Sequence, residues 1–230
     1  MRDEVERAFG AVPSPPVPSR PVVNEPEQTS ERRVELRKAG GHELLIAAYK
    51  APARDHPDSY ALDVLAHVLG QGRLSRLYRR LVEPGFAVQT EADNQIVGAD
   101  PFLFVIDVEP AREIPAERVS EILDEEIALI GREGIRTDEL ERARKRARVG
   151  FILRRARVSS RTFLIGESEV LGSWHLLEGY LDQLDRVTVE SVAEAARRYL
   201  SRGRRTWARF VPEAQASREA TAQPGQGGGA

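Results

Sequence analysis

The sequence of 230 residues contains no cysteine. It therefore has no disulfide bond, no thiol nucleophile and no cysteine-ligated zinc site, and it leaves the redox compartment undetermined. Long apolar runs are also missing, because no stretch approaches the ~20 residues that span a bilayer. The N-terminal segment MRDEVERAFGAV lacks the apolar core of a secretory signal. We therefore expect no membrane partner and no export signal here, so that a cytoplasmic and a periplasmic location both stay open.

An excess of one charge is absent as well. The chain has 34 Lys and Arg residues against 36 Asp and Glu residues, with a formal net charge of −2. Whole-chain electrostatics therefore do not predict binding to nucleic acid or to a membrane surface. Hydrophobic residues make up 41% and charged residues 30% of the sequence, which is typical of a globular protein with a highly charged surface.

Motifs for catalysis and for metal binding are missing too. The sequence contains no G-x-S-x-G, and no two histidines are spaced i, i+4 or belong to H-x-x-E-H. Gly70 and Gly72 follow a predicted helix, whereas a phosphate-binding loop follows a strand. Within this chain we therefore predict no catalytic residue, no metal site and no cofactor, and we place His67 on the outer side of its helix. The four histidines are His42, His56, His67 and His175.

Proline is concentrated near the N-terminus, with six prolines in PSPPVPSRPVVNEP (13–26). Because proline fixes φ and lacks a backbone donor, we predict an extended linker over 13–30. Residues 1–12 have the pattern of the last helix of a preceding domain. We expect the domain proper at 31–213, and the low-complexity tail at 214–230 is predicted to be disordered.

The apolar pattern between 31 and 213 predicts an α+β fold. Val34 and Leu36 are expected on the buried side of a half-buried strand, and Thr137 is expected to cap its helix. Strands are predicted at 31–38, 42–52, 88–98, 100–110 and 205–213. Helices are predicted at 55–70, 74–82, 116–132, from 137 onward, and at 160–172, 174–184 and 188–201. This order indicates a mostly antiparallel sheet that several helices cover on one face.

The most basic segment is ERARKRARVGFILRRAR (141–157), with eight basic residues from Arg142 to Arg157. Such a density is one signal of nucleic-acid binding. However, no stacking aromatic residues are interleaved with the arginines. We therefore favour an ordinary charged helix and no nucleic-acid partner, with binding through 141–157 as the alternative. Its predicted buried stripe consists of Leu140, Ala143, Ala147, Gly150 and Phe151.

A series of motifs resembles one known family. LGQGRLSRLYRRLVEPGFA (69–87) is similar to the L-G-G-G-x-S-S-R-L-Y-x-x-L-R-E-x-x-G-L-A-Y signature of the pitrilysin/insulinase zinc peptidases, where it belongs to the second of two homologous halves. FLFVIDVEP (102–110) and DRVTVESVAEAARRYLS (185–201) follow in the order of the family. The resemblance covers about 30–212, and it identifies the chain as similar to the C-terminal, non-zinc-binding half of such an enzyme, including mitochondrial processing peptidase.

The resemblance implies how the chain works. The family's first half carries H-x-x-E-H and holds the zinc, so zinc is expected only in a partner half or subunit. Unfolded peptide is the implied substrate, and a homodimer or a heterodimer stays open. The second half often contributes an Arg and a Tyr that stabilise the oxyanion, but Val82 and Val88 occupy these positions here. Candidate substrate-binding residues are Arg73, Arg76, Arg79 and Arg80, each with a structural or solvated role as the alternative.

We therefore predict a non-catalytic half or subunit of a zinc metallopeptidase, which forms part of a chamber wall and contributes to peptide binding. The isolated chain is expected to lack peptidase activity. The alternative is a free-standing scaffold or interaction protein with the same fold. In either case Gly70 and Gly72 are predicted to form a structural corner at which two helices meet closely.

Overall fold

The computed structural model describes residues 2–13, 26–95, 100–170 and 172–213. A five-stranded sheet with the order β1-β5-β2-β4-β3 forms its centre. Neighbouring strands are antiparallel except β1 and β5, which are parallel. This arrangement confirms the mostly antiparallel sheet. The strands are β1 (Arg32–Ala39), β2 (Leu44–Lys50), β3 (Ala87–Gln95), β4 (Leu103–Pro110) and β5 (Arg205–Glu213).

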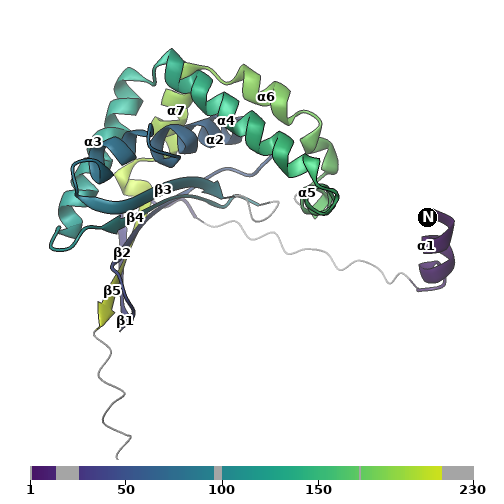
Figure 1. Ribbon diagram of the computed structural model, residues 1–230, viewed down its shortest axis with the longest axis horizontal. Coiled ribbons are helices and arrows are strands. Elements are labelled where there is room, and N and C mark those ends of the chain that lie inside the picture. Colours follow the sequence, from purple (N-terminus) through teal and green to yellow (C-terminus); the bar gives the residue numbers. More distant parts are fainter. Residues whose placement is uncertain (1, 14–25, 96–99, 171, 214–230) are drawn as a thin grey trace, which may run out of the picture.

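The helices from α2 to α7 lie over one face of this sheet, as predicted (Figure 1). The described part of the chain has no helix long and apolar enough to cross a membrane. The α-helices are α1 (Arg2–Phe9), α2 (Asp58–Gly70), α3 (Ala116–Glu133), α4 (Thr137–Ala156), α5 (Val158–Val170), α6 (Tyr180–Arg186) and α7 (Val189–Tyr199). The short helices are the π-helix η1 (Tyr78–Val82) and the 3-10 helices η2 (Trp174–Leu177) and η3 (Arg202–Arg204).

Two predicted helix boundaries are wrong. The helix expected at 174–184 is divided into η2 and α6, because the chain turns at Gly179, which precedes the first residue of α6. Thr137 does not cap α4 but is its first residue, and Arg136 holds the cap position in an extended conformation. The Glu139 carboxylate accepts a hydrogen bond from the Arg136 backbone N–H at 2.8 Å. The N-cap of α4 therefore lies one residue earlier than expected. The predicted disorder of 214–230 lies outside the described residues.

The first strand is also different from the prediction. Val34 and Leu36 are 54% and 56% exposed, and all eight residues of β1 are exposed. β1 pairs only with β5 at the sheet edge, beyond the helix layer (Figure 1). The alternating pattern of the sequence describes two faces of a strand, but it does not reveal that neither face is covered.

Helix α2 is the most buried helix of the layer. Only Asp58, Asp63 and His67 of its thirteen residues are not buried. The helix can lie against β3 because its last residue is Gly70. A Cβ atom at this position would lie 2.1 Å from the backbone nitrogen of Ala92.

The glycine corner therefore differs from the prediction. Gly70 allows a helix to approach a strand, not another helix. Gly72 has a φ of +85° and lies under the guanidinium of Arg146 from α4. Its positive φ, which residues with a Cβ rarely adopt, turns the chain away from α2.

Arg205 is a fully buried charge at the start of β5. Its guanidinium donates hydrogen bonds to Glu31 at 3.0 Å, to Asp124 of α3 at 2.7 Å and to Ser120 at 3.1 Å. Burial acts to raise the pKa of Glu31, but hydrogen bonds from Arg205 and Arg33 bring this pKa below its ordinary value. One side chain thus connects the segment before β1, the last strand and the helix layer.

The first prediction concerns this buried network. Arg205→Met leaves the carboxylates of Glu31 and Asp124 without their main partner, so the free energy of unfolding should fall by about 3–5 kcal/mol. Arg209→Met is the matched control, since Arg209 pairs with Glu43 at 2.6 Å but is 34% exposed, and it should cost at most about 1 kcal/mol. Urea unfolding measures both values. Equal losses for the two variants would contradict the role of Arg205.

The second prediction concerns the contact between α2 and β3. Gly70→Ala places a methyl group against the backbone of β3, so it should lower the free energy of unfolding by about 1–3 kcal/mol or more. Gly150→Ala is the control, because a Cβ at Gly150 in α4 meets nothing within 4 Å. It should stabilise the protein by about 0.5–1 kcal/mol through helix propensity. A neutral Gly70→Ala variant would show that the helix does not depend on this close contact.

Candidate substrate-binding site

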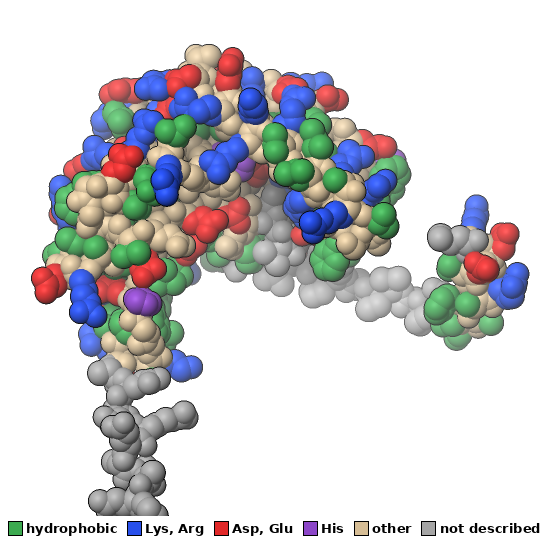
Figure 2. Space-filling view, viewed as in Figure 1, with side chains coloured by type: hydrophobic (Ala, Val, Ile, Leu, Met, Phe, Trp, Pro, Cys, Tyr) green, Lys and Arg blue, Asp and Glu red, His purple; other side chains and the backbone are tan. Residues whose placement is uncertain are grey.

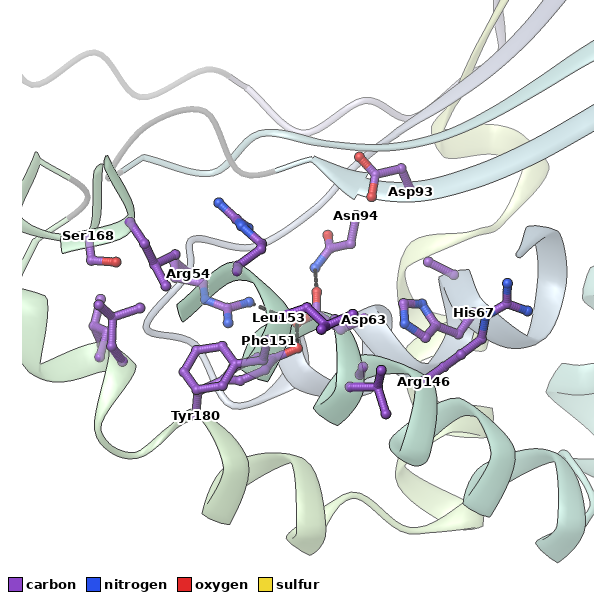
Figure 3. A pocket seen from close by; sticks show the side chains of 18 of the residues that line it. Arg54, Asp63, His67, Asp93, Asn94, Arg146, Phe151, Leu153, Ser168 and Tyr180 are labelled. Atoms are coloured by element: carbon purple, nitrogen blue, oxygen red, sulfur yellow. Dashed lines mark hydrogen bonds and ion pairs between the residues drawn. The ribbon is translucent and has the colours of Figure 1, made fainter. Parts of the chain in front are cut away.

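A cavity of about 640 Å³ lies between α2, α4, α5 and the C-terminal end of β3 (Figure 3). Asp63 and His67, two of the polar residues of α2, point toward it from successive turns. The other side chains come from the loop after β2, from β3 and from the helices α4 to α6. Its lining residues include Arg54, Asp63, His67, Asp93, Asn94, Arg146, Phe151, Leu164 and Tyr180.

Asp63 is the centre of the polar contacts in this cavity. Its carboxylate accepts hydrogen bonds from Arg54 at 2.9 Å, from Asn94 at 2.8 Å and from the Tyr180 hydroxyl at 3.4 Å. The Arg54 guanidinium lies 5.0 Å from the ring centre of Tyr60 and 4.9 Å from that of Tyr180. Burial acts to lower the pKa of Arg54, but Asp63 raises it above the ordinary value. Arg54 therefore stays protonated, and the Asp63 carboxylate accepts hydrogen bonds from three side chains.

His67 lies at the cavity and not on the outer side of its helix, so that expectation is wrong. Its buried Nδ1 atom has no hydrogen-bond partner within the described residues. Burial lowers the pKa of His67, so the imidazole is neutral near pH 7. The sequence signal that could have found this site is the pair of polar residues, Asp63 and His67, spaced i, i+4 on an otherwise apolar helix.

This pair does not make a metal centre. No group of three or more His, Cys, Asp or Glu side chains in the described ranges could hold a metal ion. Arg54 and Arg146 bring positive charge to the cavity instead. Asp63 already accepts three hydrogen bonds, which leaves little capacity for a cation.

A second cavity of about 400 Å³ continues this space along α4. The two cavities share His67, Gln71, Arg146 and Val149. The Arg146 guanidinium lines both cavities and donates a hydrogen bond to the carbonyl oxygen of Gln71 at 2.7 Å.

The buried face of α4 is narrower than predicted. Leu140, Ala143, Ala147 and Phe151 are buried as expected, but Gly150 is exposed. Gly150 is among the residues that line the larger cavity. At this point α4 therefore borders the cavity and does not pack against the rest of the helix layer.

Most arginines of the segment 141–157 bind other parts of the protein. Arg148 donates two hydrogen bonds of 2.7 Å to the carboxylate of Asp185, and Arg154 pairs with Glu167 at 3.1 Å. Arg144 donates to the backbone carbonyls of Asp185 and Val187. Basic and acidic side chains are interspersed over the helix layer (Figure 2). These contacts favour the charged helix over a nucleic-acid surface.

The four candidate arginines have different surroundings. Arg76 is turned inward and donates to Glu139 at 2.7 and 2.9 Å and to Glu126 at 3.1 Å, which ties the chain before η1 to α3 and α4. Arg80 pairs with Glu125 at 2.6 Å on the surface. Arg73 and Arg79 are exposed. A role of any of the four in substrate binding stays a prediction.

The two valines lie before and within β3. Val82 packs partly buried against the core, whereas Val88 is 61% exposed at a register irregularity between Ala87 and Gln89. Neither side chain can donate a hydrogen bond. If the family's Arg and Tyr act at these positions, this chain supplies neither.

The sheet face opposite the helices carries acidic residues where β3 pairs with β4. Ala92 and Ile106 face the helices and are fully buried, so their neighbours Glu91 and Asp107 point away. These two carboxylates are directly opposite each other in the register of β3 and β4. Burial and the charges of Glu91 and Asp93 raise the pKa of Asp107 above its ordinary value.

The described residues form an α+β domain in which no group of side chains could hold a metal ion. The family model described as the peptidase M16 inactive domain matches residues 1–147. The chain therefore belongs to this family. This match confirms the resemblance to a non-zinc-binding peptidase half, and it agrees with the absence of a catalytic motif from the sequence.

Relatives of this chain are zinc proteases. The chain is 38% identical to the zinc protease PqqE of Helicobacter pylori over 88 residues, which are 37% of this chain and 20% of PqqE. It is 33% identical to a zinc protease of Mycobacterium bovis over 156 residues, 66% of this chain and 35% of that protein. The structure of a protease from Helicobacter pylori matches with a TM-score of 0.83 at 24% identity, covering 92% of this chain and 52% of that one. The chain thus spans only about a fifth to a half of the length of these proteins.

The third prediction concerns the acidic face. Because the pKa of Asp107 is raised in the folded protein, the folded state binds more protons above the ordinary carboxyl pKa, and stability falls as pH rises through this window. Asp107→Asn should therefore raise the free energy of unfolding near pH 7 by about 0.2–1 kcal/mol, the usual effect of removing like charges across strands. The gain should disappear below about pH 4, where the carboxyl group is protonated.

Urea unfolding at both pH values measures this difference. Asp55→Asn serves as the control, since Asp55 lies exposed in the loop after β2. A gain that is independent of pH, or a loss near pH 7, would show that Asp107 is not repelled by its neighbours.

Proposed function

We propose that the chain is the non-catalytic half of a zinc metallopeptidase and forms part of the wall of a chamber that a zinc-bearing half or subunit closes. The observation that carries this proposal is the uncovered sheet face. Leu44, Ile46 and Phe210 point away from the helices and are only partly buried. A sheet face with apolar residues is normally covered by another layer, and the described chain provides none on this side.

The catalytic groups are assigned to the partner. The family match and the zinc-protease relatives support this division. With Val82 and Val88 in the positions of the family's Arg and Tyr, this chain contributes no oxyanion donor there. Its own contribution is to exclude water from the chamber and to hold the peptide.

The edge of β3 is the best place for an extended peptide. β3 is the outermost strand on its side of the sheet, and Asp93 and Asn94 at its end line the larger cavity. An extended peptide can add to such an edge through backbone hydrogen bonds. The opposite edge, β1, carries charged residues at Arg32, Arg33 and Arg37, which disfavour strand addition.

The exposed arginines before β3 extend this surface. Arg73 and Arg79 have solvent-exposed side chains near the start of the strand, so they are free to contact carbonyl or carboxylate groups of a peptide. Arg80 can do so if its surface pair with Glu125 opens. Arg76 has a structural role and does not contact the peptide, because its guanidinium is bound to Glu126 and Glu139.

The proposed organisation also includes the N-terminal residues. We assign 1–12 to the last helix of a preceding half, 13–30 to the linker and 31–213 to the inactive domain. None of the residues of α1 is buried, although Val5 and Phe9 form an apolar stripe. This supports a helix whose packing partner lies in the other half.

The fourth prediction follows from this division of labour. The chain alone should contain no stoichiometric zinc and should not cleave an unfolded peptide, because its sequence has no H-x-x-E-H and its described residues offer no group that could hold a metal ion. An equimolar mixture with a zinc-bearing half from its own source should form a complex and cleave the peptide. Metal analysis, size-exclusion chromatography and a peptide-cleavage assay measure these properties, with the zinc-bearing half alone as control.

Two outcomes would decide against the proposal. Turnover by the isolated chain would show that the active site is here. Failure to associate with a zinc-bearing half from its own source would favour the free-standing scaffold.

A further inference from the structure

The smaller cavity has the features of a built binding site. It lies between the end of α2, the loop of residues 71–75 and α4, and its volume of about 400 Å³ is within the range of ligand pockets. Leu74 and Val149 line it and are 58% and 47% exposed. Large apolar side chains at a cavity mouth favour a ligand with an apolar group.

The charge at this cavity is unbalanced. Within the described residues Lys145 has no ion pair, and Arg146 donates its hydrogen bond to the carbonyl oxygen of Gln71 and not to a carboxylate. The acidic lining residue, Glu139, is neutralised by Arg76 at 2.7 Å. The third basic residue that lines the cavity, Arg142, shares its acidic partner Asp138 with Arg136. The cavity therefore attracts an anionic group.

Unpartnered polar atoms give the second, independent observation. Ser75 lines the cavity and is 3% exposed, yet its hydroxyl has no hydrogen-bond partner within the described part of the chain. The buried Nδ1 atom of His67 also has no hydrogen-bond partner within the described residues. A buried polar group without a partner costs about 1–3 kcal/mol, so a ligand that accepts a hydrogen bond from Ser75 would recover this loss.

We propose that this cavity binds the carboxylate of an acidic residue, together with an adjacent apolar side chain, within an extended peptide. Lys145 and Arg146 supply the positive charge, Ser75 donates a hydrogen bond, and Leu74 and Val149 contact the apolar side chain. The lining residues include no Phe, Tyr or Trp ring on which a nucleic-acid base could stack. That the peptide is a substrate rests on the proposed function, whereas the binding itself does not.

Fluorescence anisotropy of a labelled peptide with the complete chain tests this site. The probe is a short, C-terminally amidated peptide with a Leu-Glu-Leu core, and its control has Gln in place of Glu. The Glu peptide should bind about tenfold more tightly than the Gln peptide at low salt, and the difference should shrink as salt increases. A Gln peptide with a free C-terminus distinguishes an internal acidic residue from a chain terminus.

Two variants connect the binding to the cavity. Lys145→Glu should weaken the binding of the Glu peptide at least about tenfold, and this variant should bind a Leu-Lys-Leu peptide more tightly than the Glu peptide. Lys38→Glu makes the same charge change on the exposed strand β1 and should leave binding unchanged. Ser75→Ala should weaken binding several-fold without lowering the free energy of unfolding, because it removes an unpartnered hydroxyl. A merely structural serine would not give this combination.

The inference is overturned if the Glu and Gln peptides bind equally, or if Lys145→Glu has no greater effect than Lys38→Glu. Binding only to a free C-terminus, or preference for a single-stranded oligonucleotide over the Glu peptide, would assign the cavity to another ligand and also overturn it. Complex formation with a zinc-bearing half is a separate readout. The proposed function can therefore fail while peptide binding persists, and the reverse also holds.

Discussion

The close contact between α2 and β3 determines how the helix layer lies on the sheet. At Gly70 no side chain separates the helix from the backbone of Ala92, so α2 is buried along nearly its whole length. Asp63 and His67, two of the three residues of α2 that are not buried, then point toward the space between α4, α5 and the end of β3. The same contact that packs the core therefore creates the larger cavity.

Arginine holds the elements together in this protein. Arg205 connects the entry of the chain to α3 and β5, Arg76 connects the chain before η1 to α3 and α4, and Arg54 connects the loop after β2 to α2. A planar guanidinium with several donors can bind two carboxylates at once, which suits it to such junctions. These three arginines therefore act inside the fold, although most basic side chains of the described residues lie on the surface. Lys145 and Arg146 differ from these three arginines because they have no carboxylate partner in the described residues.

The sequence predicted much of the architecture but little of the site. Residue periodicity located the central strand β2 and the long helix α3, because both have a regular apolar pattern. It did not show that β1 is an uncovered edge, since strand order depends on distant segments. The cavity was missed for the same reason: Asp63 meets Arg54 nine residues away and Tyr180 117 residues away. Only the spacing of Asp63 and His67 gave a local sign of it.

The open sheet face, the edge of β3 and the two cavities lie on a protein with no metal site among its described residues. We propose that the zinc is held by a partner half. The most direct measurement is the zinc content of the reconstituted assembly when all four histidines of this chain are replaced by glutamine. The account predicts the same zinc content as with the unchanged chain, and a loss of zinc on this replacement would contradict it.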